Sequence, residues 1–252
     1  MEPEAFSVLR ASVSSDRLGP YLTACAGDQA AAARLYAWNI RASGAFHAPL
    51  GCLEVACRNA MHQQLSAMFG REDWWDASEL GLHHTAQRIA SDAKREVQRW
   101  RGDITSGRMV AELPFGFWVS LLGSGADYET RLWRPGLRRA FPGYRGRRAT
   151  LHLELDACRR LRNRIAHHEP IYARDLNADH ARIVRLLGYV SWEYSGWVQA
   201  HDRVPAVLAA RLDIWPRGSC GRLLAIPAPR LMAIKIGLEP GDGHISARAD
   251  QA

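Results

Sequence analysis

The chain has 252 residues, of which 47% are hydrophobic and 23% are charged, and it carries a net charge of +7. This composition is that of a globular protein and excludes general disorder, which requires low hydrophobicity and a high net charge. It also excludes a multi-pass membrane protein, because the longest apolar stretch, around Leu113–Leu122, is about half of the ~20 residues that a spanning helix needs. The length predicts one large domain or two small ones.

The first residues and the cysteines indicate a cytoplasmic protein. The chain starts with the acidic sequence MEPE and lacks the basic and apolar regions of a secretory signal. The number of cysteines is odd and no CxxC pair occurs, so we expect reduced thiols and no zinc site. The sequence has no glycine-rich phosphate loop and no carboxylate cluster, and we therefore expect neither a cofactor nor a metal.

Apolar residues recur with the 3.6-residue period of a helix along nearly the whole chain, which predicts an all-α fold. Asp28 is a good N-cap, Gly70 is a good C-terminal stop, and Pro114 and Gly123 fit the two ends of a short helix that is apolar on all sides. The predicted helices are Asp28–Ser43, Leu50–Phe69, Leu82–Trp100, Pro114–Gly123, Arg148–His168, Asn177–Ala200 (capped by Asn177 or Asp179) and Val204–Ile214.

Prolines after Trp215 break any long helix, so residues 216–252 are predicted to be an irregular C-terminal extension of a helical domain formed by residues 1–215. Within the extension, Leu223–Ile226 and Leu231–Ile236 could be short strands or additional packing. Several tryptophans fall in helical patterns and are expected in the core rather than in a surface that stacks on bases: Trp74, Trp75, Trp118, Trp192 and Trp197.

All but two of the 33 basic residues are arginine, a bias that a GC-rich genome would also produce. Arginine binds phosphate in a bidentate manner, and the net positive charge favours polyanions over acidic proteins as partners. Two interpretations of the densest group stay open, a solvated helix and loop surface or a patch that follows a phosphate backbone. This group lies in the segment Arg131–Arg148 and consists of Arg131, Arg134, Arg138, Arg139, Arg145, Arg147 and Arg148.

The segment Leu161–Ile171, which reads LRNRIAHHEPI, is the most informative part of the chain. It ends a predicted helix with two histidines that follow several arginines, and the negative partial charge of a helix C-terminus suits such cations. Arg162 and His167 are about 140° apart around an ideal helix. They converge only if the helix unwinds before Pro170 or if they meet across a two-fold axis. A charged final turn with capping histidines is the alternative interpretation.

A second group of polar residues falls on the predicted helix Leu50–Phe69. Glu54, Arg58 and His62 follow one another at four-residue spacing and therefore share one helix face, with Asn59 beside them. One interpretation is an ion-paired contact between helices. The other places this face next to Arg162 and His167, where it would support them or contact phosphate.

Four sequence blocks in the same order resemble the Abi-like (abortive infection, AbiD/AbiF-type) branch of the HEPN superfamily, whose name stands for higher eukaryotes and prokaryotes nucleotide-binding. The last block contains the R-x4-6-H pattern of that superfamily. Together the blocks span more than half of the chain. They are Leu35-Tyr36-xx-Asn39 followed by Ala45-Phe46, the segment Leu53–Ala60 (LEVACRNA), the segment Leu113–Leu121 (LPFGFWVSL) and the segment Arg162–Ile171.

The resemblance implies an all-α bundle of HEPN type with additional N-terminal helices, acting as a homodimer. It also implies a metal-independent endoribonuclease of a phage-defence or toxin type, whose partners would be RNA and a cognate antitoxin or a phage-derived activator. A non-catalytic RNA-binding or regulatory protein and a protein-interaction scaffold are the alternatives. The candidate catalytic residues are Arg162, His167, Asn163 and His168, and the candidate RNA-binding or supporting residues are Arg58, Asn59, Glu54, Arg164 and Arg159.

The residue types suit that chemistry, since RNA carries its own nucleophile, the 2′-hydroxyl. Histidine can accept the proton of this hydroxyl or donate one to the leaving oxygen, and arginine can stabilise the charge that develops on the phosphoryl group. His168 also satisfies the spacing, although His167 is preferred. Catalysis requires Arg162 and His167 in an open basic cleft, whereas burial of His167 would favour a scaffold.

Overall fold

A computed structural model describes residues 3–101 and 103–211, and its fold is an all-α helical bundle with no strand in these ranges. The predicted extension 216–252 and its two short segments lie outside the described residues. No helix in the described ranges is long and apolar enough to cross a bilayer. The α-helices are α1 (Pro3–Val13), α2 (Ser15–Ala24), α3 (Gln29–Phe69), α4 (His84–Arg101), α5 (Ser106–Glu112), α6 (Phe115–Ser120), α7 (Arg148–Ala166), α8 (Leu176–Val190), α9 (Trp192–Ala200) and α10 (Val204–Ala209). Short 3-10 or π turns are η1 (Trp74–Asp76), η2 (Ser78–Leu80), η3 (Gly125–Asp127), η4 (Glu129–Trp133) and η5 (Leu137–Ala140).

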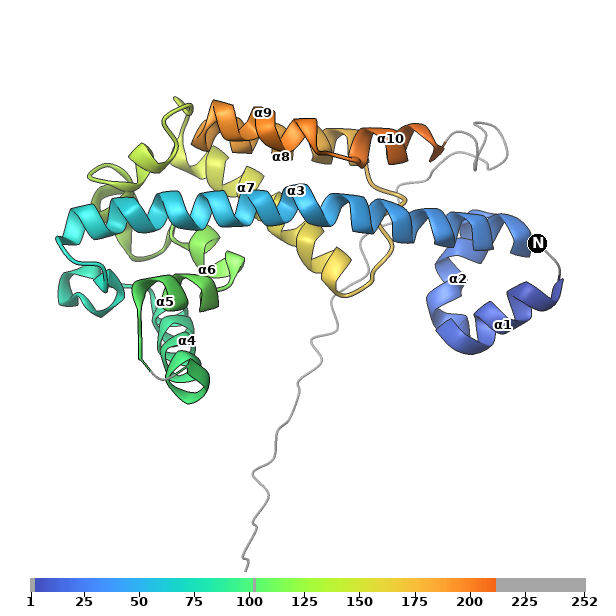
Figure 1. Cartoon of the computed structure of the whole chain (residues 1–252), viewed down its shortest axis with the longest axis horizontal. Helices are drawn as coiled ribbons and strands as arrows, with labels where there is room; N and C mark the ends of the chain where they lie inside the picture. The colour runs from blue at the N-terminus through green and yellow to red at the C-terminus, as the bar shows by residue number, and fades with distance from the viewer. Residues whose placement is uncertain (1–2, 102, 212–252) are drawn as a thin grey trace, which may run out of the picture. The chain divides into compact units, whose positions relative to one another are not determined.

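Helix α3 runs through the middle of the bundle and is 41 residues long (Figure 1). Its predicted ends are confirmed, since the Asp28 side chain accepts a bond from the Ala31 N–H and Gly70 has the left-handed φ of 65°. The prediction of two separate helices in this region is wrong, because the helix continues through Pro49. That proline is buried, and contacts of α3 with α2, α6, α7, α8 and α10 hold both halves of the helix in one line.

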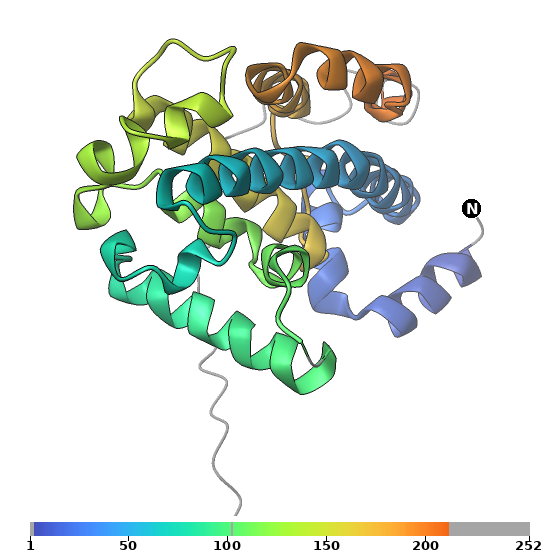
Figure 2. The ribbon, with the colours of Figure 1, turned by 60° about the vertical axis from the view of Figure 1, so that its left-hand side comes forward.

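Two groups of helices lie on opposite sides of α3, and the two views in Figures 1 and 2 agree on this arrangement. Helices α8, α9 and α10 lie on one side, and α4, α5 and α6 lie on the other. Helix α7 packs against α3, α6 and α8 and so links the two groups. The C-terminus of α7 is thereby held against the first half of α3.

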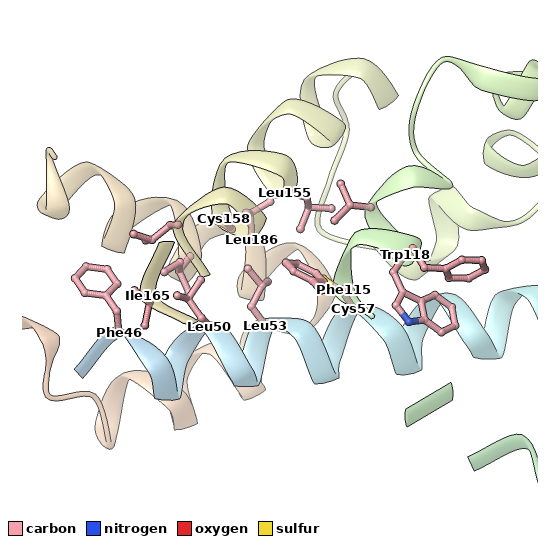
Figure 3. Packing of buried hydrophobic residues seen from close by; sticks show 14 of the residues in the cluster. Phe46, Leu50, Leu53, Cys57, Phe115, Trp118, Leu155, Cys158, Ile165 and Leu186 are labelled. Atoms are coloured by element: carbon pink, nitrogen blue, oxygen red, sulfur yellow. The ribbon is translucent and has the colours of Figure 1, made fainter. Parts of the chain in front are cut away.

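The core between α3 and α7 consists of closely packed apolar side chains (Figure 3). Leu53 of α3 is fully buried, and Leu155 and Cys158 of α7 are at most 2% exposed. The short helix α6 is buried as predicted, although Pro114 is its N-cap residue rather than part of its first turn. This packing fixes the crossing of α3 and α7, which positions the polar side chains described below.

The region predicted as one helix, Asn177–Ala200, is two helices that are separated at Ser191. Ser191 is extended, with φ −154° and ψ 126°, and its hydroxyl accepts a bond from the Tyr194 N–H. The first of these helices is capped by Asp175, not by the two predicted residues.

The break changes where the tryptophans of this region lie. Trp192 and Trp197 are 77% and 55% exposed, so the prediction that they are core residues is wrong. The same prediction is confirmed for Trp74, Trp75 and Trp118, which are at most 8% exposed.

Candidate functional site

Helix α7 ends in an unwound turn that contains the two histidines. His167 is the C-cap residue and His168 has a left-handed φ of 55°. The His168 N–H donates to the Ile165 carbonyl at 3.0 Å and the Glu169 N–H donates to the Arg164 carbonyl at 2.8 Å. These bonds form a Schellman motif, in which the left-handed position is usually glycine. The helix therefore unwinds before Pro170 as expected, but only from His168, which occupies the left-handed position. The His167 N–H still bonds to the Asn163 carbonyl as in a regular helix, so this unwinding does not bring Arg162 and His167 to the same side.

Side chains from distant parts of the chain hold this turn in place. Arg17 of α2 donates to the His168 carbonyl at 2.6 Å. The buried Asn39 of α3 accepts from the N–H groups of Ile171 and Tyr172 at 2.8 and 3.1 Å. A left-handed non-glycine residue costs about 1–3 kcal/mol and persists only where the surroundings fix it. The first and last of the four sequence blocks thus meet at this turn.

Arg164, predicted as an RNA-binding or supporting residue, is part of the same turn. Its Nη2 donates to the Pro170 carbonyl at 2.9 Å, and its Nε lies 3.5 Å from Oε2 of Glu169. The half-buried guanidinium thus contacts the residues that end the helix. Its contacts in the structure are those of a residue that stabilises the turn.

Arg162 reaches from α7 to α3. Its Nε lies 3.5 Å from Oε2 of Glu54, and their side chains are 43% and 16% exposed. Glu54 therefore pairs across the helix contact, and no ion pair of the described residues joins it to Arg58, four positions further along α3. Arg58 is half-buried and its Nε has no hydrogen-bond partner in the described structure. The structure brings Glu54 to Arg162 and leaves Nε of Arg58, on the same face of α3, without a hydrogen-bond partner among the described residues.

The two histidines are exposed, and their imidazoles make no hydrogen bond to any described residue. Within residues 3–101 and 103–211, no hydrogen bond or ion pair joins Arg162 to His167. Asn163 contributes its carbonyl, which accepts the His167 N–H at 2.9 Å. The end of α7 therefore presents two exposed imidazoles, and the exposed Arg162 one turn earlier also faces Glu54.

Two further predicted residues are not brought into contact with this turn. Arg159 pairs with Asp156 at 2.7 Å, and its Cδ lies 3.5 Å from the position that a Cβ on Gly116 would occupy, so it faces α6. Asn59 is exposed and makes no hydrogen bond to another candidate within the described ranges. On an ideal helix Asn59 is about 140° from Glu54, which explains its separation from Arg162.

A cavity of about 640 Å³ borders the turn and lies between α2, α3 and the end of α7. Its wall includes the imidazole-bearing residues His47 and His168, the guanidinium-bearing Arg17, and apolar residues such as Ile40 and Ile165. Sequence reasoning did not single out Arg17 or His47. No local pattern marks them, because the fold alone brings these two residues to the end of α7.

Three other potentially reactive side chains on α3 and α7 have structural roles, namely Cys57, Cys158 and His62. Burial raises the pKa of the Cys158 thiol to about 12 and that of the neighbouring Cys57 further, so both are protonated thiols rather than nucleophiles at neutral pH. Burial lowers the pKa of His62. Its Nδ1 accepts a hydrogen bond from Nε1–H of Trp74 at 2.9 Å. His62 is therefore a neutral packing residue.

Comparison of the chain with protein-family models, with curated proteins and with solved structures finds no match. The HEPN resemblance thus stays a prediction from the quoted residues. In the described part of the chain, no three His, Cys, Asp or Glu side chains are grouped so that they could hold a metal ion.

Proposed function

We propose that the protein is a cytoplasmic, metal-independent endoribonuclease of a phage-defence or toxin type that cleaves RNA with Arg162 and His167. One observation carries this proposal: Arg162 and His167 are exposed near the end of α7, and the turn that follows contains the left-handed His168 and is held by Arg17 and Asn39. Strained, over-determined turns are enriched at active sites. The scaffold alternative would be favoured by a buried His167, whereas this imidazole is exposed.

In this reaction the His167 imidazole accepts the proton of a 2′-hydroxyl, and the 2′-oxygen attacks the adjacent phosphorus. The Arg162 guanidinium binds the non-bridging phosphoryl oxygens and stabilises their added negative charge. The bond from phosphorus to the 5′-oxygen breaks, and this oxygen takes a proton from a second imidazole, for which His168 is the nearest candidate in sequence. The products are a 2′,3′-cyclic phosphate and a 5′-hydroxyl.

The exposed face of α3 supports a homodimer as the active form. Ile40 and Val55 are 54% and 38% exposed on this face. Between them, Gly44 and Gly51 have open space where a side chain would be. Small residues between exposed apolar ones let two helices approach closely, because interaxial distance depends on the side chains at the contact.

This face is complementary to itself in an antiparallel arrangement. A two-fold axis next to His47 would place Ile40 against Val55 of a second copy and Gly44 against Gly51. Glu54, which pairs with Arg162, directly precedes Val55 in α3, so the second copy would adjoin the proposed site.

The decisive experiment incubates the purified protein with end-labelled RNA in excess EDTA. We expect cleavage to 2′,3′-cyclic phosphate ends by the wild type, and a loss of about 10²–10⁴-fold in the Arg162→Ala and His167→Ala variants. His84→Ala is the matched control, because it removes an exposed histidine on α4. If the wild type binds RNA without cleaving it, the nuclease proposal is wrong and the protein is a non-catalytic RNA-binding protein. If both variants keep full activity, Arg162 and His167 are not the catalytic residues.

The dimer is tested separately by light scattering after gel filtration. We expect the wild type to be a dimer and Val55→Arg to be a monomer, because the new charge would face Ile40 and lie near Arg41 of the second copy. Leu153→Arg serves as a control, since Leu153 is 62% exposed on α7. A dimer that persists in the Val55→Arg variant would place the interface elsewhere.

A further inference from the structure

An arginine-rich loop is held against the junction of α8 and α9, on the opposite side of α3 from α4. The Gly143 N–H donates to the Tyr189 carbonyl at 3.0 Å, and a Cβ on Gly143 would lie 2.8 Å from the carbonyl oxygen of Gly188, so only glycine fits there. The rings of Tyr144 and Tyr189 are 4.9 Å apart. Figures 1 and 2 both show the yellow-green loop beside the start of α9.

The arginines of this region fall into two groups, according to whether a described carboxylate pairs with the guanidinium. Arg134 and Arg148 are paired with Glu129, at 3.2 and 2.8 Å. Four others are exposed, and no described residue forms a hydrogen bond or ion pair with their guanidinium groups; they are Arg138, Arg139, Arg145 and Arg147. Unpaired guanidinium groups on a surface are available to bind phosphate.

An exposed aromatic side chain follows the end of α8 to which this loop is bonded. Trp192 follows Tyr189 by three residues, at the first position of α9, and it is 77% exposed. No ring of the described residues stacks on its indole. The exposed acid beside it, Glu193, is ionised, since hydrogen bonds from its own backbone N–H and from the Ser191 hydroxyl lower its pKa. A second acid, Glu154, acts on the Tyr144 hydroxyl and is paired with Arg185 at 2.8 Å. The arginines outnumber these two carboxylates, so the surface is positive.

We propose that these four arginines together with Tyr144, Tyr189 and Trp192, which we name the arginine–aromatic surface, bind single-stranded RNA. The proposal rests on the nuclease function above and assigns the surface that holds the substrate strand. Arginines would contact the phosphates while unpaired bases stack on the exposed indole. A duplex hides its bases in the stack and offers no such contact. An acidic protein would satisfy the arginines but would not require a free indole.

Binding is measured by fluorescence anisotropy with a labelled 16-nucleotide oligouridylate in EDTA. All proteins carry the His167→Ala substitution, so binding is read without cleavage and a failure of the nuclease proposal does not affect the result. We expect Trp192→Ala to weaken binding by about 5- to 150-fold, the range measured for loss of one base stack. Trp100→Ala is the matched control, because Trp100 is 73% exposed at the end of α4.

The phosphate contacts are tested by the Arg145→Gln/Arg147→Gln double variant. We expect weaker binding and a salt dependence whose logarithmic slope is smaller by roughly 1.4, or about 0.7 for each lost contact. The Arg88→Gln/Arg99→Gln variant, which changes the net charge equally on α4, should keep the wild-type slope.

Three results would overturn the proposal. The first is equal RNA affinity of the Trp192→Ala and Trp100→Ala variants. The second is equal affinity of the protein for a duplex of the same length. The third is unchanged RNA binding by both surface variants together with a change in oligomeric state, which would make this surface a protein contact.

Discussion

The histidine on α3 and the histidines at the end of α7 have opposite surroundings. His62 is packed beside Trp74, accepts its indole proton at 2.9 Å, and has a pKa that burial lowers. Trp74 in turn packs against Phe117 and Trp118, so this half-buried histidine borders the aromatic core. His167 is exposed and its ring makes no hydrogen bond to the described residues.

The difference shows that the neighbours of a histidine decide whether it can do chemistry. An imidazole can transfer a proton only if one nitrogen is free to accept and can reach the substrate. In His62 the accepting nitrogen is occupied by Trp74, whereas neither ring nitrogen of His167 bonds to a residue that the structure describes. The four-residue spacing of Glu54, Arg58 and His62 gave no sign of this distinction.

The largest expected effect comes from replacing each histidine by alanine. His167→Ala should lower the RNA cleavage rate by about 10²–10⁴-fold and change the free energy of unfolding by less than about 0.5 kcal/mol. His62→Ala should leave the cleavage rate per folded molecule nearly unchanged. It should lower the free energy of unfolding by about 1–3 kcal/mol, because the Trp74 indole N–H loses its acceptor. Cleavage assays and urea unfolding measure the two quantities. A similar loss of cleavage per folded molecule in both variants would contradict the comparison.

The next effect separates buried from exposed tryptophans. Trp118 is 1% exposed, and its Nε1 donates to the Leu113 carbonyl at 3.3 Å. Trp118→Ala should therefore lower the free energy of unfolding by about 3–5 kcal/mol. Trp192→Ala should change it by less than about 0.5 kcal/mol, because the removed side chain is exposed. Equal midpoints in urea for the two variants would show that the core assignment is wrong.

Much of the fold follows from local signals in the sequence. The Asp28 cap, the Gly70 stop, the buried helix after Pro114 and the end of α7 before Pro170 each depend on a few adjacent residues. Such signals act over one or two turns, so sequence analysis can detect them. The all-α class follows from the sum of these signals.

Long-range packing determines the features of the fold and of the candidate site that local signals do not predict. Pro49 is a helix breaker by local rules, yet contacts with several other helices keep α3 continuous. Ser191 interrupts a strong apolar period because its own hydroxyl caps the next helix, and this break exposes Trp192. At the candidate site, the fold brings Arg17 from α2 to the His168 carbonyl, which no spacing in the sequence could indicate.

A smaller effect tests the strain at the end of α7. His168 occupies a left-handed position, with φ 55°, in which glycine has no steric cost. His168→Gly should raise the free energy of unfolding by about 0.5–1 kcal/mol, since the relieved strain exceeds the added flexibility of the unfolded chain. If His167 is the base, cleavage should fall less in this variant than in His167→Ala. His168→Ala, which keeps a Cβ in the same conformation, should show no gain in urea unfolding.

The smallest effect concerns pH. Burial lowers the folded-state pKa of His62 and of His152 below the unfolded value of about 6.5, so the unfolded chain binds these protons more readily. Their contribution to stability is therefore present above about pH 6.5 and is lost as the pH falls below it. Urea unfolding between pH 7.5 and 5.5 should show this decline, and His62→Gln should make it shallower. A slope in the His62→Gln variant equal to that of the wild type would contradict the lowered pKa of His62.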